Sequence, residues 1–235
     1  MACSKGVFRS SGRQPQWWDP EYGGVRPLPN FKTANGLTRI PLNLGIGESG
    51  FVVFRGSAGI ASPTAKNFPS YRAIENVAGL WQVSFDPHWG GPSGPVTFAT
   101  LDDWSTRPED GIKYYSGKAD YTVSFSLPAG VKASVGSYTI SLGDVKDLAT
   151  VSLNGRDLGI VWCSPWRLVI PAGLIKPTGN KLKITVANLW INRLIGDAGK
   201  PQDQRLTWTT GEFYSPTSPL QPSGLLGPVT LERKL

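Results

Sequence analysis

The chain has 235 residues, with 28 Gly, 20 Pro, 9 Trp, a single His and a formal net charge of +7. This length supports a hydrophobic core without disulfides or metals, and one histidine, His88, disfavours a Ser-His-Asp triad or a zinc site. The Lys and Arg residues are scattered among turns, and no apolar stretch approaches the length of a membrane span. We therefore expect neither nucleic acid nor a membrane as a partner.

Residues 1–56 predict a small β-rich segment, for which one interpretation is the remnant of a preceding β domain. Its turn-rich sequence contains three strand-like stretches, at residues 25–28, 39–44 and 51–54, and the last is an apolar run between two glycines. Residues 57–70 mix Gly, Ser, Pro, Ala and Lys without a period and indicate a linker.

Residues 71–235 predict a larger β domain, because apolar and polar residues alternate in short stretches separated by turns. The expected strands span residues 80–85, 119–127, 138–142, 149–153, 166–170 and 182–186, with a final strand near 227–232. Asn154-Gly155 favours a type I′ hairpin turn, since both residues tolerate positive φ. The fold class is therefore all-β, a jelly-roll-like β-sandwich with few, short helices, preceded by the smaller segment.

Catalytic candidates are limited to carboxylates, because a glycosidase needs only two of them, one protonated and one ionised. The candidates are Glu109, Asp110, Asp197 and Glu212. The pair Glu109-Asp110 equally favours a turn, in which the carboxylates bind nearby backbone N–H groups. No spacing of Asp residues indicates a metal site, so we expect no cofactor, with a structural Ca²⁺ as the one exception left open.

The aromatic residues are the stronger signal, because sugars stack their C–H faces on Trp and Tyr while polar side chains bind the hydroxyls. The carbohydrate-binding candidates are Trp89, Trp104, Tyr114 and Tyr115 for stacking, and Asp103, Arg107, Asn192 and Arg193 for hydrogen bonds. Two alternatives stay open. For the aromatic residues, the alternative is that the rings only cover the ends of the sandwich. For the polar residues of 188–197, it is that an Arg193–Asp197 ion pair ties down the loop.

Several motifs in one order resemble glycoside hydrolase family 106, the α-L-rhamnosidases. Those resembling an ancillary β domain are residues 8–20 (FRSSGRQPQWWDP), 38–44 (TRIPLNL) and 48–54 (ESGFVVF). Those resembling the family's C-terminal, galactose-binding-like sandwich, shared in outline with β-galactosidase-type (family 2) enzymes, are residues 79–92 (GLWQVSFDPHWGGP), 104–117 (WSTRPEDGIKYYSG), 151–159 (VSLNGRDLG), 188–197 (NLWINRLIGD) and 223–228 (SGLLGP).

The resemblance implies a catalytic barrel that precedes these domains, and the chain shows no (β/α)₈ pattern. It therefore implies a non-catalytic accessory region with a carbohydrate ligand, a barrel domain as partner, and an exported parent enzyme. The N-terminal residues include no signal-peptide pattern. We expect a carbohydrate-binding module for plant cell-wall glycans. The alternatives are a small glycoside hydrolase and a structural domain that supports a barrel.

Overall fold

The computed structural model describes residues 2–45, 47–57, 59–133 and 137–235, and it divides into two compact units. The first unit ends at Tyr71 and also takes Leu235, and the second unit is Arg72–Lys234. Each has its own hydrophobic core. The predicted all-β fold, a sandwich preceded by a smaller β-rich segment, is confirmed.

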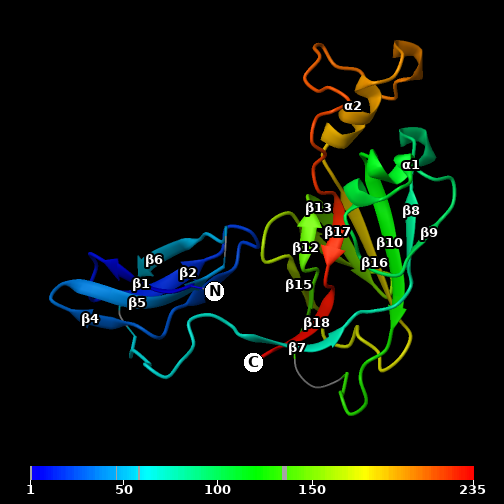
Figure 1. Cartoon of the computed structure of the whole chain (residues 1–235). Helices are drawn as coiled ribbons and strands as arrows, with labels where there is room; N and C mark the ends of the chain where they lie inside the picture. Colours follow the sequence, from blue (N-terminus) through cyan, green and yellow to red (C-terminus); the bar gives the residue numbers. More distant parts are fainter. Residues whose placement is uncertain (1, 46, 58, 134–136) are drawn as a thin grey trace. The chain divides into compact units, whose positions relative to one another are not determined.

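The first unit consists of two antiparallel sheets of three strands each, drawn in blue to cyan in Figure 1. One sheet has the order β1–β5–β4, with β1 at Ala2–Phe8, β5 at Leu37–Leu44 and β4 at Lys32–Ala34. The other has the order β3–β2–β6, with β3 at Val25–Pro27, β2 at Gln14–Trp18 and β6 at Phe51–Arg55. The inner faces of these sheets form a core around Trp17, Leu28, Phe31 and Ile40.

The segment predicted as a linker, residues 57–70, groups with the first unit and makes contacts to it. The side-chain amide of Asn67 is buried and donates to the carbonyl oxygens of Asn30 (2.7 Å) and Pro41 (3.1 Å). The ring of Phe68 meets the buried Trp17 edge-on, with 5.2 Å between centroids. Backbone contacts add to these two side chains, because Ser62 N donates to Pro29 O (2.8 Å).

The second unit is a sandwich of two main antiparallel sheets with a two-stranded ribbon. The larger sheet has the order β14–β13–β16–β10–β8–β9, with bounds Arg156–Val161, Leu148–Leu153, Asn180–Ala187, Lys118–Phe125, Trp81–Phe85 and Val96–Phe98. The facing sheet has the order β15–β11–β18–β7, with bounds Arg167–Ile170, Tyr138–Ser141, Thr230–Lys234 and Tyr71–Asn76. The ribbon pairs β12 (Asp144–Lys146) with β17 (Gly224–Gly227).

Alternation of side chains explains the core of the second unit. In β10, Tyr121, Val123 and Phe125 are buried, whereas Thr122 and Ser124 point to solvent. The hairpin between β13 and β14 turns at Asn154 and Gly155, which have φ of +52° and +81°. The predicted type I′ turn therefore has the backbone that it requires.

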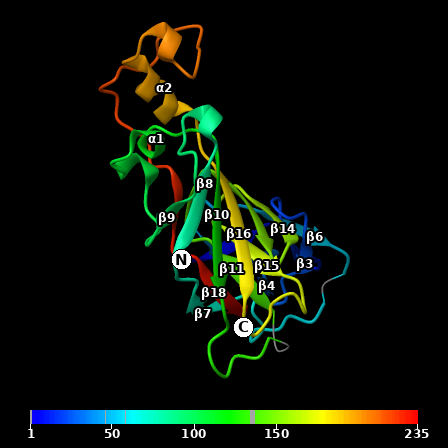
Figure 2. The same ribbon diagram turned by 90° about the vertical axis from the view of Figure 1, so that its right-hand side faces the viewer.

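The few helices gather at one end of the sandwich, as Figures 1 and 2 show for α1 and α2. The α-helices are α1 (Asp110–Lys113) and α2 (Ile191–Ala198), and the 3₁₀-helices are η1 (Pro87–Trp89), η2 (Trp104–Thr106) and η3 (Gln202–Gln204). None of the helices in the described ranges is long and apolar enough to cross a membrane.

Candidate carbohydrate-binding site

An exposed pair of tryptophans lies at the helical end of the second unit. Trp89 in η1 and Trp190, which directly precedes α2, meet edge-to-face, with 5.1 Å between ring centroids and 76° between planes. Their exposed fractions are 38% and 47%. Edge-to-face packing leaves ring surface in contact with water, so the pair offers an apolar platform of the kind on which a sugar stacks.

The loop that carries Trp89 is held in shape by local contacts. Asp86 caps η1 by accepting a hydrogen bond from His88 N (2.9 Å), and this bond is the main reason why the pKa of Asp86 is lowered. Pro87 begins the helix, and Gly90 ends it with a left-handed φ of +77°. The exposed imidazole of His88 lies 3.0 Å from the Asp86 carboxylate, so two polar groups stand in the same loop as the ring.

Trp190 is a site residue that the sequence candidates did not include, although the segment 188–197 was singled out. Two residues before Trp190, Asn188 anchors this segment, since it accepts from Gly117 N (2.9 Å) and donates to Tyr115 O (2.9 Å). A small pocket of about 180 Å³ adjoins this segment. Its lining residues are Lys146, Asp147, Leu189, Ile191, Asn192, Gln221, Pro222 and Ser223. The sequence does contain a signal for Trp190, because the residue follows the predicted strand at 182–186 and is flanked by the amides of Asn188 and Asn192.

Two of the predicted stacking residues, Trp104 and Tyr115, are buried, and their prediction as sugar-stacking rings is corrected. Trp104 is 0% exposed, stacks on Tyr121 at 6.3 Å and donates from Nε1 to its hydroxyl (2.5 Å). Tyr115 is also 0% exposed and donates to Lys118 O (2.7 Å). A ring enclosed on all sides cannot meet a ligand, so both belong to the core.

Tyr114 is half-buried against α2. A Cβ atom at Gly196 would lie 2.7 Å from the Cβ of Tyr114, so glycine permits α2 to approach α1 closely. Lys113 Nζ lies 5.4 Å from the centroid of the Tyr114 ring. The structure thus brings Tyr114 to the helical end as a half-buried packing residue.

The predicted polar residues Asp103 and Arg107 organise the loop between β9 and α1. Asp103 Oδ1 caps η2 by accepting from Ser105 N (2.9 Å), and it also accepts from Ser223 N (2.9 Å). Arg107 binds both oxygens of Glu109 (2.9 and 3.2 Å) and covers the buried ring of Phe98 at 4.5 Å. The hydrogen bonds that these two side chains make are therefore to other groups of the protein.

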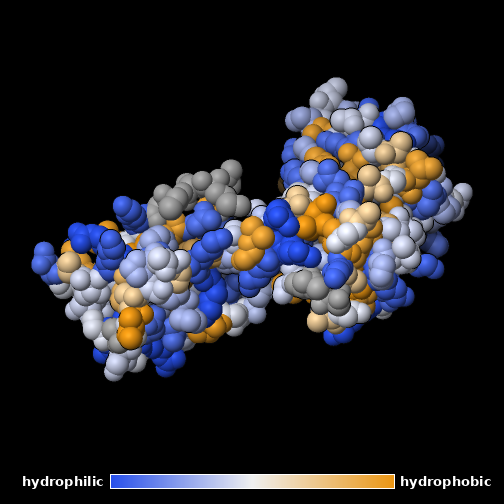
Figure 3. Space-filling view, turned by 90° about the horizontal axis from the view of Figure 1, so that it is seen from below, coloured by the Kyte–Doolittle hydropathy of each residue, from blue (hydrophilic) through white to orange (hydrophobic). Residues whose placement is uncertain are grey.

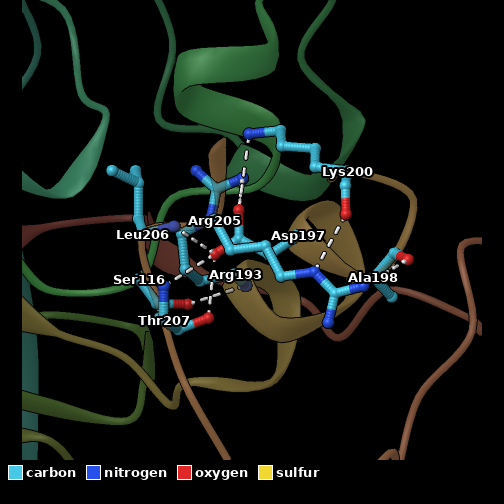
Figure 4. A network of polar contacts seen from close by, with 8 residues as sticks. All are labelled: Ser116, Arg193, Asp197, Ala198, Lys200, Arg205, Leu206 and Thr207. Carbon is cyan, nitrogen blue, oxygen red and sulfur yellow. Dashed lines mark hydrogen bonds and ion pairs between the residues drawn. The ribbon is translucent and has the colours of Figure 1, made fainter. Parts of the chain in front are cut away.

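Asp197, in α2, is the centre of a buried polar network, shown in Figure 4. Its Oδ2 accepts from Leu206 N (2.9 Å), Thr207 N (3.0 Å) and Thr207 Oγ1 (2.8 Å). Its Oδ1 lies 3.3 Å from Arg193 Nη2. The side chains of Arg193 and Asp197 are 4% and 3% exposed, and their ion pair lies within α2. The hydrogen bonds from Leu206 and Thr207 to Asp197 tie the chain after α2 back onto the helix.

Asn192, also in α2, joins the helix to residues Gln221 and Ser223. It donates to Gln221 O (2.7 Å) and Ser223 Oγ (3.0 Å) and accepts from Gln221 N (2.8 Å). Asn192 is 1% exposed. Of the two alternatives for residues 188–197, the loop-fixing one therefore describes Asn192, Arg193 and Asp197.

The four carboxylate candidates stand in different surroundings. The hydrogen bond from Arg107 lowers the pKa of Glu109, which is the opposite of what a general acid needs. Asp197 is buried, whereas Asp110 in the first turn of α1 and Glu212 are exposed. Within the described residues, no group of three or more His, Cys, Asp or Glu side chains is placed to hold a metal ion.

No protein-family model matches the sequence. A curated protein of Formosa agariphila, named "Putative beta-glucuronidase", is 32% identical over 203 residues, which are 74% of this chain and 17% of that protein. A solved structure of a rhamnosidase from Novosphingobium sp. PP1Y matches 98% of this chain and 21% of its own, with 39% identity and a TM-score of 0.85.

A β-glucuronidase structure from Ruminococcus gnavus matches 50% of the chain at 21% identity and a TM-score of 0.41, which is too weak to support an argument. The two stronger matches show that the chain is related to glycoside-hydrolase proteins. The chain spans about a fifth of the length of the relatives that it matches.

Proposed function

We propose that this chain is a carbohydrate-binding accessory region of a glycoside hydrolase, corresponding to the C-terminal, non-catalytic part of a family 106 α-L-rhamnosidase-like enzyme. The observation that carries the proposal is the structural match to the Novosphingobium rhamnosidase, which extends over 98% of this chain but only 21% of that protein. A match of this kind supports an accessory region within a larger enzyme, with a catalytic barrel as its partner.

The binding surface in this proposal is the pair Trp89 and Trp190. One sugar ring stacks on the exposed indole face, and the carboxylate of Asp86 and the imidazole of His88 meet its hydroxyls from the same loop. A pair of aromatic rings gains about 0.5–1.5 kcal/mol beyond the burial of area, and we expect a sugar face stacked on one indole to gain no more. Because the tryptophan pair is a shallow platform, we expect it to bind a single glycan chain weakly and to select for the shape of the sugar ring.

Calorimetric titration with neutral plant cell-wall oligosaccharides (galactan, arabinan and xyloglucan fragments) and with L-rhamnose tests this role. We expect binding by the native chain and its loss in Trp89→Ala and Trp190→Ala. The matched control is Trp162→Ala, because Trp162 is 59% exposed and follows β14, at the opposite edge of the sheet from β8 and β9. Equal loss in all three variants, or no binding by the native chain, contradicts the proposed site.

A second candidate role, structural support of a catalytic domain, is favoured by a different observation. The segment after α2 exposes large apolar side chains, with Trp208 at 78% and Phe213 at 71%. Exposed apolar patches mark surfaces that pack against other protein. In this role the isolated chain self-associates in sedimentation experiments, Trp208→Ser/Phe213→Ser makes it monomeric, and glycan titrations give no heat with any variant.

A further inference from the structure

The positive charge of the chain is concentrated in its first unit. Residues 1–71 contain eight Lys or Arg and three Asp or Glu, and so account for +5 of the total charge of +7. Figure 3 shows hydrophilic residues over much of this unit on the face in view. Two of its carboxylates are used locally: Asp19 accepts from the backbone of its own turn, and Glu48 accepts from Gly45 N (2.7 Å).

Three of the cations lie on one face of the β1–β5–β4 sheet. In β5, Thr38 and Ile40 are buried in the core, so Arg39 between them faces outward. Lys32 of β4 lies directly opposite Arg39. On the other side of β5, Val7 of β1 is opposite Arg39, and Lys5 is two residues earlier on the same face. Directly opposite residues in an antiparallel pair have Cβ atoms about 5 Å apart, and diagonal ones about 7–8 Å.

Among the strand positions whose side chains the structure describes, none on that face is acidic. The other strand positions with described side chains that share it are Val7, Ala34, Leu37, Pro41 and Asn43. Among the residues that the structure describes, no ion pair includes Lys5, Lys32 or Arg39, and all three are exposed. Like charges directly opposite one another destabilise a sheet. An anion on this face relieves the repulsion between Lys32 and Arg39.

We propose that the outer face of the β1–β5–β4 sheet binds a glycan that carries carboxylate groups, a uronic-acid polymer. An extended polyanion matches a flat strand surface with several cations in reach, and its charge is complementary to the +5 of this unit. No aromatic side chain accompanies the cations at these strand positions, which disfavours single-stranded nucleic acid, because such binding relies on stacked bases. The site lies in a different unit from Trp89 and is independent of it.

The test is affinity electrophoresis of the full chain in gels that contain polygalacturonate, and in parallel gels that contain fully methyl-esterified polygalacturonate. The variant is Lys32→Gln/Arg39→Gln. The control with the same loss of charge is Lys176→Gln/Lys181→Gln, which removes two exposed cations of the second unit. We expect the native chain to be retarded by polygalacturonate only, with retardation falling as salt screens the contact. We expect the face variant to bind at least about tenfold more weakly, since charged contacts to a polyanion are lost.

Three outcomes overturn the proposal. Equal retardation by the methyl-esterified polymer shows that carboxylates are not recognised. Equal weakening in the Lys176→Gln/Lys181→Gln control shows a general effect of net charge. Equal or tighter binding of single-stranded DNA assigns the face to nucleic acid. Trp89→Ala keeps native retardation by polygalacturonate, so failure at this face and failure at the tryptophan pair are distinguishable. A cooperative thermal unfolding transition shows that each variant is folded.

Discussion

Replacing Asp197 by alanine removes the centre of the network that holds the chain after α2 onto that helix. The loss leaves Arg193, whose side chain is 4% exposed, without its ion-pair partner. It also leaves Leu206 N and Thr207 N without their acceptor. Removing one member of a buried ion pair costs about 3–5 kcal/mol. Lys200 is 40% exposed and contributes little to this figure.

We expect Asp197→Ala to lower the free energy of unfolding in urea by up to about 3–5 kcal/mol, or to open the segment after α2 at a smaller cost. Hydrogen exchange distinguishes the two outcomes, because local opening exposes the amides of Leu206 and Thr207 while the sandwich stays protected. Asp203→Ala, in the exposed η3, is the control and changes stability by less than about 0.5 kcal/mol. Arg193→Met/Asp197→Leu recovers much of the loss, since an apolar pair has no charge to desolvate. A loss in Asp197→Ala no larger than in Asp203→Ala refutes the reasoning.

Three further predictions concern other parts of the chain. Burial raises the pKa of Tyr121 above its ordinary value, so the folded state holds the phenol proton more tightly than the unfolded state does. The free energy of unfolding therefore falls as pH rises above about 10. We expect Tyr121→Phe to flatten this pH dependence, whereas Tyr22→Phe, at an exposed position, leaves it unchanged. A methyl group at Gly50 overlaps the ring of Trp17 in the core, so Gly50→Ala destabilises the first unit by about 1–3 kcal/mol and leaves the urea transition of the second unit unchanged. Lys32→Gln removes the like charge opposite Arg39 and raises the stability of the first unit by about 0.2–1 kcal/mol at low salt, an increase that disappears at high salt.

The strands that the sequence predicted well are those buried on one face, where alternation has a physical cause. The expected strand at 119–127 is β10 (Lys118–Phe125), and that at 182–186 is β16 (Asn180–Ala187). Short strands such as β4, β9 and β12 gave no usable signal, because three residues are too few to show a period of two. Their existence depends on the neighbouring strands with which they pair.

The candidate site was predictable in kind but not in detail. The burial of Trp104 depends on Tyr121 and on Ser223, which lie 17 and 119 residues further along the chain. The contact of Trp89 with Trp190 joins two loops that the sequence gives no reason to pair. Local sequence identified aromatic rings in loops, and only the tertiary fold decides which of them face water.

The central claim, that the helical end of the second unit binds carbohydrate, is tested most directly by the indole N–H resonances of the nine tryptophans during a titration with neutral cell-wall oligosaccharides. We predict saturable shifts of the Trp89 and Trp190 resonances, assigned by their substitution with phenylalanine, while the resonances of Trp81 and Trp104, both buried in the core, stay in place. Shifts confined to other tryptophans, or no shift at millimolar ligand, contradict the claim.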